Sequence, residues 1–276
     1  MSTAAEQEYV LGHSEQEYQR LRAQARVWEE ATGRLIDKVQ LAQGARCLDA
    51  GCGPGETMRQ LAQRVGPSGE VVGVDVDAAL GAQAIEMLHG AGHHQCSFTP
   101  VDLESADPIP HGPFDLVYAR LLLFHVADPV AVIRRLWGVV APGGHLILHD
   151  YDLRATDVLP PLETAEECRR VVLGAFTGAG RDIRTGHSLP LLLARAGLGA
   201  PDGADVAGRL EPLETAGAML AAVYRSLLPA AIAMGLTTPG AAERWQEQFA
   251  RDVHDHGGHA VLWPLLIGAW KLKAAR

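Results

Sequence analysis

The sequence predicts an α/β fold, a doubly wound and mostly parallel β-sheet with helices on both faces. Short apolar strands alternate with helices of ~10–15 residues through the middle of the chain, which is typical of right-handed βαβ crossovers. The first of these strands is followed at once by a glycine-rich turn that opens a helix. No internal repeat or low-complexity tract is found, which excludes solenoids and propellers.

The first 40 residues are expected to be helical and to precede the sheet. Ser14 and Glu17 have the spacing of a capping box, and apolar residues recur every three or four positions after them. Gly33 is expected to divide this stretch into two helices. We treat residues 1–40 as an N-terminal helical lid and residues 41–276 as the domain that contains the sheet.

Strands and helices then alternate as far as residue 150. The strands are short apolar or β-branched runs, and glycine or proline ends most of the helices. The expected strands are residues 46–50, 70–76, 97–101, 114–118 and 145–150. The expected helices are residues 56–65, 78–89 and 129–140.

The pattern loosens after residue 150. We expect a weak strand at 206–210 and a final strand at 260–273, which Pro264 should place at a sheet edge or a bulge. The expected helices are residues 163–175, 189–196, 216–234 and 241–254. A helical insertion of about residues 212–256 therefore precedes the last strand and is a second candidate lid.

Composition and charge exclude several classes of protein. Of the 276 residues, 47% are hydrophobic and 21% charged, so the chain can build a core and is not disordered throughout. The net charge is -9 without any run of Lys or Arg, and 5% of the residues are aromatic, which argues against a nucleic-acid partner.

The cysteines and the apolar stretches bear on the compartment. The four cysteines form no C-x-x-C pair, so free thiols in a reducing cytosol are expected. The N-terminus resembles no signal peptide, and the apolar stretch 260–270 contains Pro264 and is too short to span a bilayer. We therefore expect a cytoplasmic protein without a membrane partner.

Residues 49–55, with the sequence DAGCGPG, lie between the first strand and the first helix of the sheet. Glycines there allow a sharp turn and leave room for a ligand against the backbone. Asp75 ends the next strand, where an acidic residue in a βαβ unit can accept hydrogen bonds from both hydroxyls of a ribose. The pattern predicts an adenosine-type ligand at the carboxyl ends of the strands.

The glycine spacing indicates which adenosine ligand. A dinucleotide fingerprint, G-x-G-x-x-G, places a pyrophosphate on the helix N-terminus. This sequence has D-x-G-x-G-x-G, with Glu56 opening the helix, and two carboxylates repel a pyrophosphate but favour a cationic ligand. A nicotinamide-dependent oxidoreductase remains the main alternative enzyme.

The segment resembles motif I of the class I S-adenosylmethionine-dependent methyltransferases. Three further segments are similar in the same order, namely 101–103, 114–117 and 141–144. The resemblance is strongest over residues 42–155 and is closest to the ubiquinone/menaquinone-methyltransferase-like group, many of whose members act on small molecules. Residues 9–26 resemble the N-terminus of actinobacterial members.

The resemblance implies a Rossmann-like, seven-stranded sheet whose last strand is antiparallel. It implies S-adenosylmethionine as cofactor and S-adenosylhomocysteine as product. Asp49, Gly51 and Gly53 would face the methionine part, with Asp49 near its ammonium group. Ala119 and Arg120 would lie under the methionine end, where Arg120 could contact the cofactor carboxylate.

The same resemblance places the nucleoside. Asp75 would hold the ribose, and Val76 would pack on the adenine. Asp102 would meet the adenine amino group beside Leu103.

Methyl transfer from a sulfonium is an in-line displacement, so the protein must align the acceptor and exclude water. An acceptor hydroxyl or ammonium also needs a general base. The candidates are His125 after the fourth strand, His149 at the end of the fifth, and Tyr9 as a lid residue over the cofactor. For each of them, a packed or solvated side chain without a catalytic role is the alternative.

The cluster at His254, His256 and His259 could suggest a metal site. Residues two apart on a helix face different ways, and histidine at a helix C-terminus is favoured by the helix dipole, so we expect no metal.

The acceptor is expected to be a small, largely apolar specialised metabolite such as a polyketide, terpenoid or quinone precursor, methylated on O, N or C. The insertion is rich in apolar residues and contains Tyr224 and Trp245, which suits either an apolar pocket or a homodimer contact. No N-P-P-Y tetrapeptide of amino-methylating enzymes follows the fourth strand. A member that binds the cofactor without methylating, as a structural element or as a cyclase, is the alternative.

Overall fold

The structure, a computed structural model, describes residues 15–275 of the chain and divides into two compact units. The sheet unit comprises Gln24–Asp150, Thr185–Val206 and the chain from Leu266 onward. The helical unit comprises the described residues up to Ala23 together with Tyr151–Arg184 and Ala207–Leu265. Helix α1 (Glu15–Val27) crosses the boundary between Ala23 of the helical unit and Gln24 of the sheet unit.

A seven-stranded sheet forms the centre of the sheet unit, in the order β3-β2-β1-β4-β5-β10-β7. Strands β3, β2, β1, β4 and β5 run parallel to one another. The start of β5 bonds to the chain at the end of β10, since Gly143 N–H donates to the Lys273 carbonyl at 2.7 Å, so β10 is antiparallel. The strands are β1 (Arg46–Ala50), β2 (Glu70–Asp75), β3 (Cys96–Pro100), β4 (Phe114–Arg120), β5 (Val140–Asp152), β7 (Gly203–Ala207) and β10 (Leu265–Leu272).

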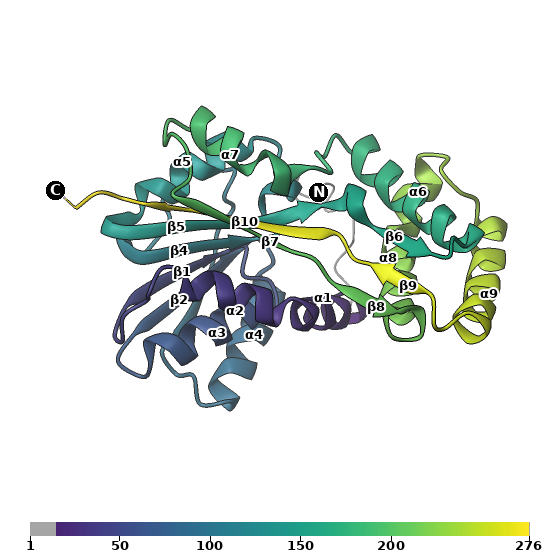
Figure 1. Cartoon of the computed structure of the whole chain (residues 1–276). Coiled ribbons are helices and arrows are strands. Elements are labelled where there is room, and N and C mark those ends of the chain that lie inside the picture. Colours follow the sequence, from purple (N-terminus) through teal and green to yellow (C-terminus); the bar gives the residue numbers. More distant parts are fainter. Residues whose placement is uncertain (1–14, 276) are drawn as a thin grey trace, which may run out of the picture. The chain divides into compact units, whose positions relative to one another are not determined.

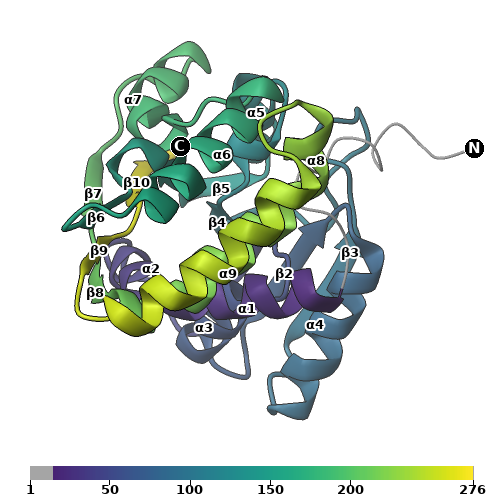
Figure 2. The same ribbon diagram turned by 90° about the vertical axis from the view of Figure 1, so that its right-hand side faces the viewer.

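Helices cover both faces of this sheet, which confirms the predicted doubly wound, Rossmann-like fold with an antiparallel last strand. Figure 1 shows α5 and α7 on one face and α2, α3 and α4 on the other, and Figure 2 shows α4 beside β3. The helices are α2 (Glu29–Asp37), α3 (Glu56–Val65), α4 (Ala78–Gly90), α5 (Pro129–Gly138) and α7 (Thr185–Arg195). The strand order changes direction between β1 and β4, where ligands of such sheets bind at the carboxyl ends.

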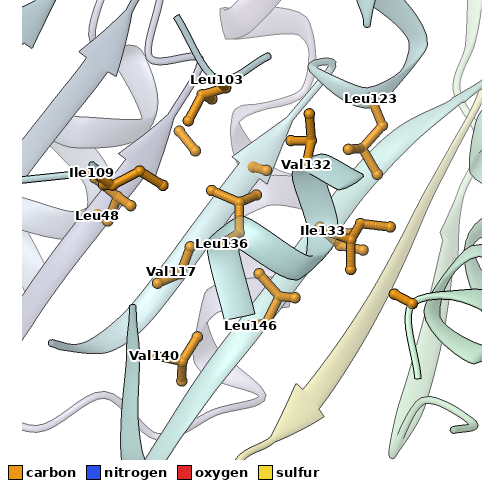
Figure 3. Close-up of a cluster of buried hydrophobic side chains, with 14 of the residues drawn as sticks. Leu48, Leu103, Ile109, Val117, Leu123, Val132, Ile133, Leu136, Val140 and Leu146 are labelled. Carbon is orange, nitrogen blue, oxygen red and sulfur yellow. The ribbon is translucent and has the colours of Figure 1, made fainter. Parts of the chain in front are cut away.

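Each face of the sheet buries its own apolar cluster. On the α5 side, Ile133 and Leu136 pack on strand residues such as Val117 and Leu146 (Figure 3). Asp128 caps this helix by accepting from Ala131 N–H at 3.0 Å, and a proline occupies its first turn. On the opposite face, α2 and α3 supply apolar side chains that pack on β1, β4 and β5. The sheet is therefore buried on both sides, as its nearly continuous apolar strands predict.

The helical unit contains three long helices and a second, antiparallel sheet. Helix α8 packs against both α6 and α9 (Figures 1 and 2). The sheet has three short strands in the order β6-β9-β8. These elements are α6 (Glu163–Gly178), α8 (Leu213–Ala233), α9 (Pro239–Asp255), β6 (Asp157–Leu159), β8 (Leu210–Pro212) and β9 (Ala260–Leu262).

Two details of the predicted elements were wrong. The first helical stretch breaks at Trp28 and not at Gly33, which lies inside α2. A β-carbon at Gly33 would lie 2.9 Å from Arg64 Nη2, so this glycine permits close packing of α2 on α3. The predicted final strand, expected at a sheet edge or a bulge, divides at Pro264 into two strands that belong to different sheets. Its second part, β10, lies inside the main sheet, and β7 forms the edge next to it.

The division into units also differs from the predicted domain boundaries. Residues 24–37 of the predicted lid belong to the sheet unit, where Leu35 and Ile36 are fully buried. The predicted insertion of about residues 212–256 lies inside the helical unit, which also takes in residues 151–184. Tyr224 and Trp245 stack on each other with ring centroids 3.7 Å apart, in the core of the helical unit.

Candidate functional site

The loop after β1 bends through three glycines at positive φ. Gly51, Gly53 and Gly55 have φ of 69°, 48° and 80°. A β-carbon at Gly51 would lie 3.0 Å from the Leu122 side chain, so the backbone there passes close to the loop after β4. Apart from Gly53 and its two chain neighbours, no heavy atom of the described residues lies within 4 Å of a β-carbon built at Gly53. The predicted turn is present, and its middle glycine faces open space.

The amide groups of this loop are already used within the protein. Gly51 and Cys52 donate to the Val74 carbonyl, at 2.8 and 3.0 Å. Gly53 donates to Asp75 Oδ2 at 2.9 Å, and Gly55 donates to the Cys52 carbonyl at 3.0 Å. Pro54 has no N–H. The loop therefore lacks the free donors that hold the pyrophosphate of a dinucleotide.

Asp49, at the end of β1, is the unusual acidic group of the site. Its side chain is 1% exposed, and its Oδ2 atom has no hydrogen-bond partner among the described residues. Burial raises the pKa of Asp49 to about 7, against the lowering effect of the Arg120 charge. A buried acceptor without a donor is rare, so this oxygen is suited to a cationic ligand group.

Asp75 ends β2 and holds the glycine loop. Its two carboxylate oxygens accept from Gly53 N–H at 2.9 Å and from Asp77 N–H at 3.0 Å, and burial raises its pKa. A carboxylate has about four acceptor positions, so Asp75 can still accept from a ribose hydroxyl. The next residue, Val76, is apolar and 55% exposed.

The chain after β3 supplies the next predicted residues. Asp102 is exposed, and its Oδ1 atom accepts from Glu104 N–H at 2.8 Å. Leu103 is 4% exposed and belongs to the core on the α5 face. The hydrogen bond from Glu104 thus holds Asp102 just beyond the carboxyl end of β3, while Leu103 is mainly a packing residue.

Arg120 ends β4 beside His149 of β5, which is its partner in the strand register. Its Nη1 atom donates to Thr32 Oγ1 of α2 at 3.1 Å. Tyr118, two residues earlier, lies opposite Asp49 in register, so these side chains share the α2 face of the sheet. Ala119 is 2% exposed and packs on the opposite face.

His149 is held in the interior. It is 2% exposed, its Nδ1 atom is 2.7 Å from the Tyr118 hydroxyl, and the two rings meet edge to face. Burial, with the charges of Arg120 and Arg34, lowers its pKa well below the usual value. These surroundings support the packed alternative for His149 and do not support its predicted role as a base.

The other two candidate bases lie elsewhere. His125 ends a short 3-10 helix, Leu123–His125, in the loop after β4, and its half-buried ring packs on Phe124 with centroids 4.4 Å apart. It is the one predicted histidine on the loop beside the glycine turn. Tyr9 lies outside the described residues.

Sequence reasoning missed three side chains of this region. Thr32, Tyr118 and Glu104 bond to residues 88, 31 and 23 positions away in the chain. Such pairings depend on the tertiary fold and leave no local pattern. Tyr118 lies in the continuous apolar run of β4, and this run could have marked it as a buried polar group.

Two further features concern metals and membranes. Among the residues that the structure describes, no group of three or more His, Cys, Asp or Glu side chains could hold a metal ion. His259 instead uses Nδ1 to bond the Pro160 carbonyl at 2.9 Å. Of the described helices, α8 alone has the length and hydropathy of a membrane span, a test that the helix of a soluble core also passes.

Comparison with known proteins decides the family. Residues 48–148, from β1 to β5, match the family described as methyltransferase domain. Residues 48–148 form a class I, S-adenosylmethionine-dependent methyltransferase domain.

The relatives of this methyltransferase domain share different portions of the chain. An uncharacterized 37.1 kDa protein of a Streptomyces fradiae transposon is 27% identical over 78% of this chain and 61% of its own length. Trans-aconitate 2-methyltransferase of Variovorax paradoxus is 38% identical over 44% of each chain. The chain thus spans about half the length of the curated relatives that it matches.

A solved structure shows the same fold. A candidate methyltransferase of Bacillus halodurans superposes with a TM-score of 0.58 at 16% identity, covering 88% of this chain and 99% of its own. This likeness extends beyond the methyltransferase domain and concerns the fold alone.

Proposed function

We propose that the whole chain transfers the methyl group of S-adenosylmethionine to a small, largely apolar metabolite. The observation that carries this proposal is the buried Asp49 Oδ2 atom, which has no hydrogen-bond partner among the described residues and lies beside a loop whose amides are all used. This combination suits a ligand with an ammonium group and disfavours a pyrophosphate. A nicotinamide cofactor is therefore the weaker alternative.

We assign each part of the cofactor to residues at the carboxyl ends of the strands. Asp49, Gly51 and Gly53 would hold the methionine moiety, with its ammonium on Asp49. Arg120, steadied by Thr32, would bind the carboxylate. S-adenosylmethionine supplies an electrophilic methyl group on a sulfonium.

The nucleoside would lie along the ends of β2 and β3. Asp75 would accept from the ribose while it keeps Gly53 in place. The exposed Val76 side chain would cover the adenine, and Asp102 would accept from its amino group.

The protein's part in the transfer is to position the acceptor and to move a proton where one is lost. Collinear alignment and exclusion of water would supply much of the acceleration. His125 is the base that we favour for a hydroxyl or ammonium acceptor, because it lies on the loop after β4 and is only half-buried. Ala119 would support the methionine end from within β4.

The class of acceptor is argued from composition and from the relatives. A net charge of -9 disfavours nucleic acid, and the relative named for trans-aconitate methylates a small molecule. The apolar residues of α8 favour a specialised metabolite such as a polyketide, terpenoid or quinone precursor. The predicted lid roles belong to this proposal for residues 1–23 and about 212–256, because Leu35 and Ile36 of α2 are core residues of the sheet unit.

The setting of the enzyme completes the proposal. All four cysteines are free and buried, in keeping with a reducing cytoplasm. We place no membrane or nucleic-acid partner on the chain, and we keep a homodimer as its proposed assembly.

A transfer assay tests the activity. The protein is incubated with S-adenosylmethionine labelled in its methyl group and a panel of hydroxylated, amino and carbanion-forming metabolites. Labelled product from at least one apolar acceptor is expected. Tight binding of S-adenosylhomocysteine without transfer to any acceptor, combined with ring closure of a polyene substrate, would instead identify a non-methylating cyclase.

A further inference from the structure

The loop that joins β4 to α5, residues 121–128, is held at three points. Its first residue, Leu121, donates N–H to the His149 carbonyl at 2.8 Å. Phe124 N–H donates to Asp150 Oδ2 at 3.2 Å, and Ala127 N–H donates to Glu104 Oε1 at 2.7 Å. Two of the three attachments are therefore side-chain carboxylates from other strands and loops.

The loop needs such attachments because of its backbone. Leu121 has φ of 53°, a left-handed conformation that non-glycine residues rarely adopt. A residue of this kind persists where its surroundings hold it, and such positions gather at binding sites. The loop carries His125, the base favoured above, and Leu122, which lies against Gly51 of the glycine loop.

Glu104 connects this loop to the adenine side of the proposed cofactor site. Its own N–H donates to Asp102 Oδ1 at 2.8 Å, two residues earlier. Arg135 of α5 reaches back and donates to the carbonyls of Asp102 at 3.0 Å and Ser105 at 2.5 Å. The chain after β3 is thus linked to the loop before α5 through Glu104 and to the last turn of α5 through Arg135.

Through these bonds, a ligand at Asp102 could influence the loop that carries His125. A ligand that bonds to Asp102 acts on the group that orients the Glu104 backbone, and Glu104 in turn holds the end of the His125 loop. Glu104 is an exposed residue, and it is not among the buried residues of the core. Glu104 thus bonds to Asp102 through its backbone N–H and to the loop through its side-chain carboxylate.

We propose that Glu104 is a positioning residue that transmits binding of the cofactor at Asp102 to the loop carrying His125. This inference rests on the proposed function, because it takes the adenine to lie at Asp102. Asp150 is the second attachment of the same loop, and it is 1% exposed.

Hydrogen exchange of the full chain, followed by mass spectrometry with and without S-adenosylhomocysteine, tests the proposal. In the natural protein, the ligand is expected to slow exchange in residues 121–128. Glu104→Ala should raise exchange in this loop about tenfold and abolish the slowing, because a hydrogen bond to a charged group is lost. Glu104→Gln keeps an oxygen acceptor and should restore most of both effects.

The control is Glu86→Ala, which removes an exposed glutamate from α4. It should leave both the loop and its response unchanged. Asp150→Asn serves as a second variant and should loosen the loop at Phe124 while the response through Glu104 persists. A folded Glu104→Ala protein that binds the ligand and still shows slowed exchange in 121–128 would overturn the inference. Absence of ligand binding by the natural protein would overturn the proposed function as well.

Discussion

Asp49 is buried at an energetic cost to folding, and we propose that it binds the cofactor. Its carboxylate is buried, one oxygen has no partner among the described residues, and its pKa is raised to about 7 because burial disfavours the charge. The raised pKa means that the folded protein binds a proton that the unfolded chain has released. Stability is therefore lost as pH rises from the ordinary value of 3.8 through 7.

Asp49→Asn should change stability and binding in opposite directions. At pH 8, the free energy of unfolding of the variant should exceed that of the natural protein by up to about 4 kcal/mol. This difference should vanish near pH 4. Its affinity for S-adenosylhomocysteine should fall about 10- to 100-fold because the charged acceptor is lost. Urea unfolding and calorimetric titration measure the two effects.

The same residue predicts how binding depends on pH. The deprotonated carboxylate is the form that would accept from an ammonium group, so affinity should rise about tenfold from pH 6 to pH 8 in the natural protein. Asp49→Asn should show no such rise. A variant with the pH profile of the natural protein would remove Asp49 from the proposed site.

Gly53 tests whether the open space beside the loop is the cofactor site. Gly53→Ala should destabilise the protein by about 1 kcal/mol, because Gly53 has a positive φ. It should also lower the affinity for S-adenosylhomocysteine by more than about tenfold, because the added methyl group fills that space. Gly92→Ala is a matched control, because Gly92 has φ of 88° and its β-carbon would also meet nothing within 4 Å. Equal affinity of the two variants would contradict the placement.

At the scale of elements, α2 matters more to the sheet than its predicted lid role suggests. Its residues Leu35 and Ile36 are fully buried with strand residues, and Thr32 bonds Arg120. The helix therefore positions a proposed cofactor residue as well as covering one face of the sheet.

Gly268→Ala in β10 probes the packing of α2. A β-carbon there would lie 2.3 Å from Leu35 Cδ2, so the substitution should destabilise the protein by about 1–3 kcal/mol through overpacking. Gly138→Ala, at the end of α5 with no atom within 4 Å of its β-carbon, should be neutral or slightly stabilising. Urea unfolding compares them, and equal stabilities would show that α2 does not pack closely on β10.

The elements also show how far sequence reasoning reaches. Strands β1, β2 and β4 were predicted to within two residues, because buried parallel strands are continuous apolar runs bounded by turns. The strands β6, β8 and β9 have three residues each, too few for a periodic pattern, and only β9 fell inside a predicted strand. Asp75 was proposed from its place at the end of a strand in a βαβ unit, and Asp49 from the family resemblance. The Thr32–Arg120 bond depends on the docking of α2 and leaves no local pattern.

At the scale of the whole molecule, part of the net charge of -9 lies at the proposed cofactor site. Asp49, Asp75 and Asp102 follow or end three neighbouring parallel strands, which suits a cationic cofactor and disfavours a pyrophosphate. The two compact units divide the chain elsewhere than at the predicted boundary at residue 40, because α2 is part of the core of the sheet unit.

Deletion of the N-terminal segment should respect these units. Removal of residues 1–40 would take Leu35 and Ile36 from the core, at about 2–5 kcal/mol each, and would test folding only. Removal of residues 1–23 leaves α2 intact and tests the lid. Turnover should fall while S-adenosylhomocysteine binding is largely kept. Unchanged turnover would exclude a lid role for this segment.

The most direct test of the central claim is calorimetric titration of the full chain at pH 8 with S-adenosylhomocysteine and, separately, with reduced nicotinamide adenine dinucleotide. Because the loop amides are used internally and Asp49 offers an unpartnered carboxylate, we predict one-to-one binding of S-adenosylhomocysteine and no binding of the dinucleotide. Binding of the dinucleotide without binding of S-adenosylhomocysteine would contradict the account.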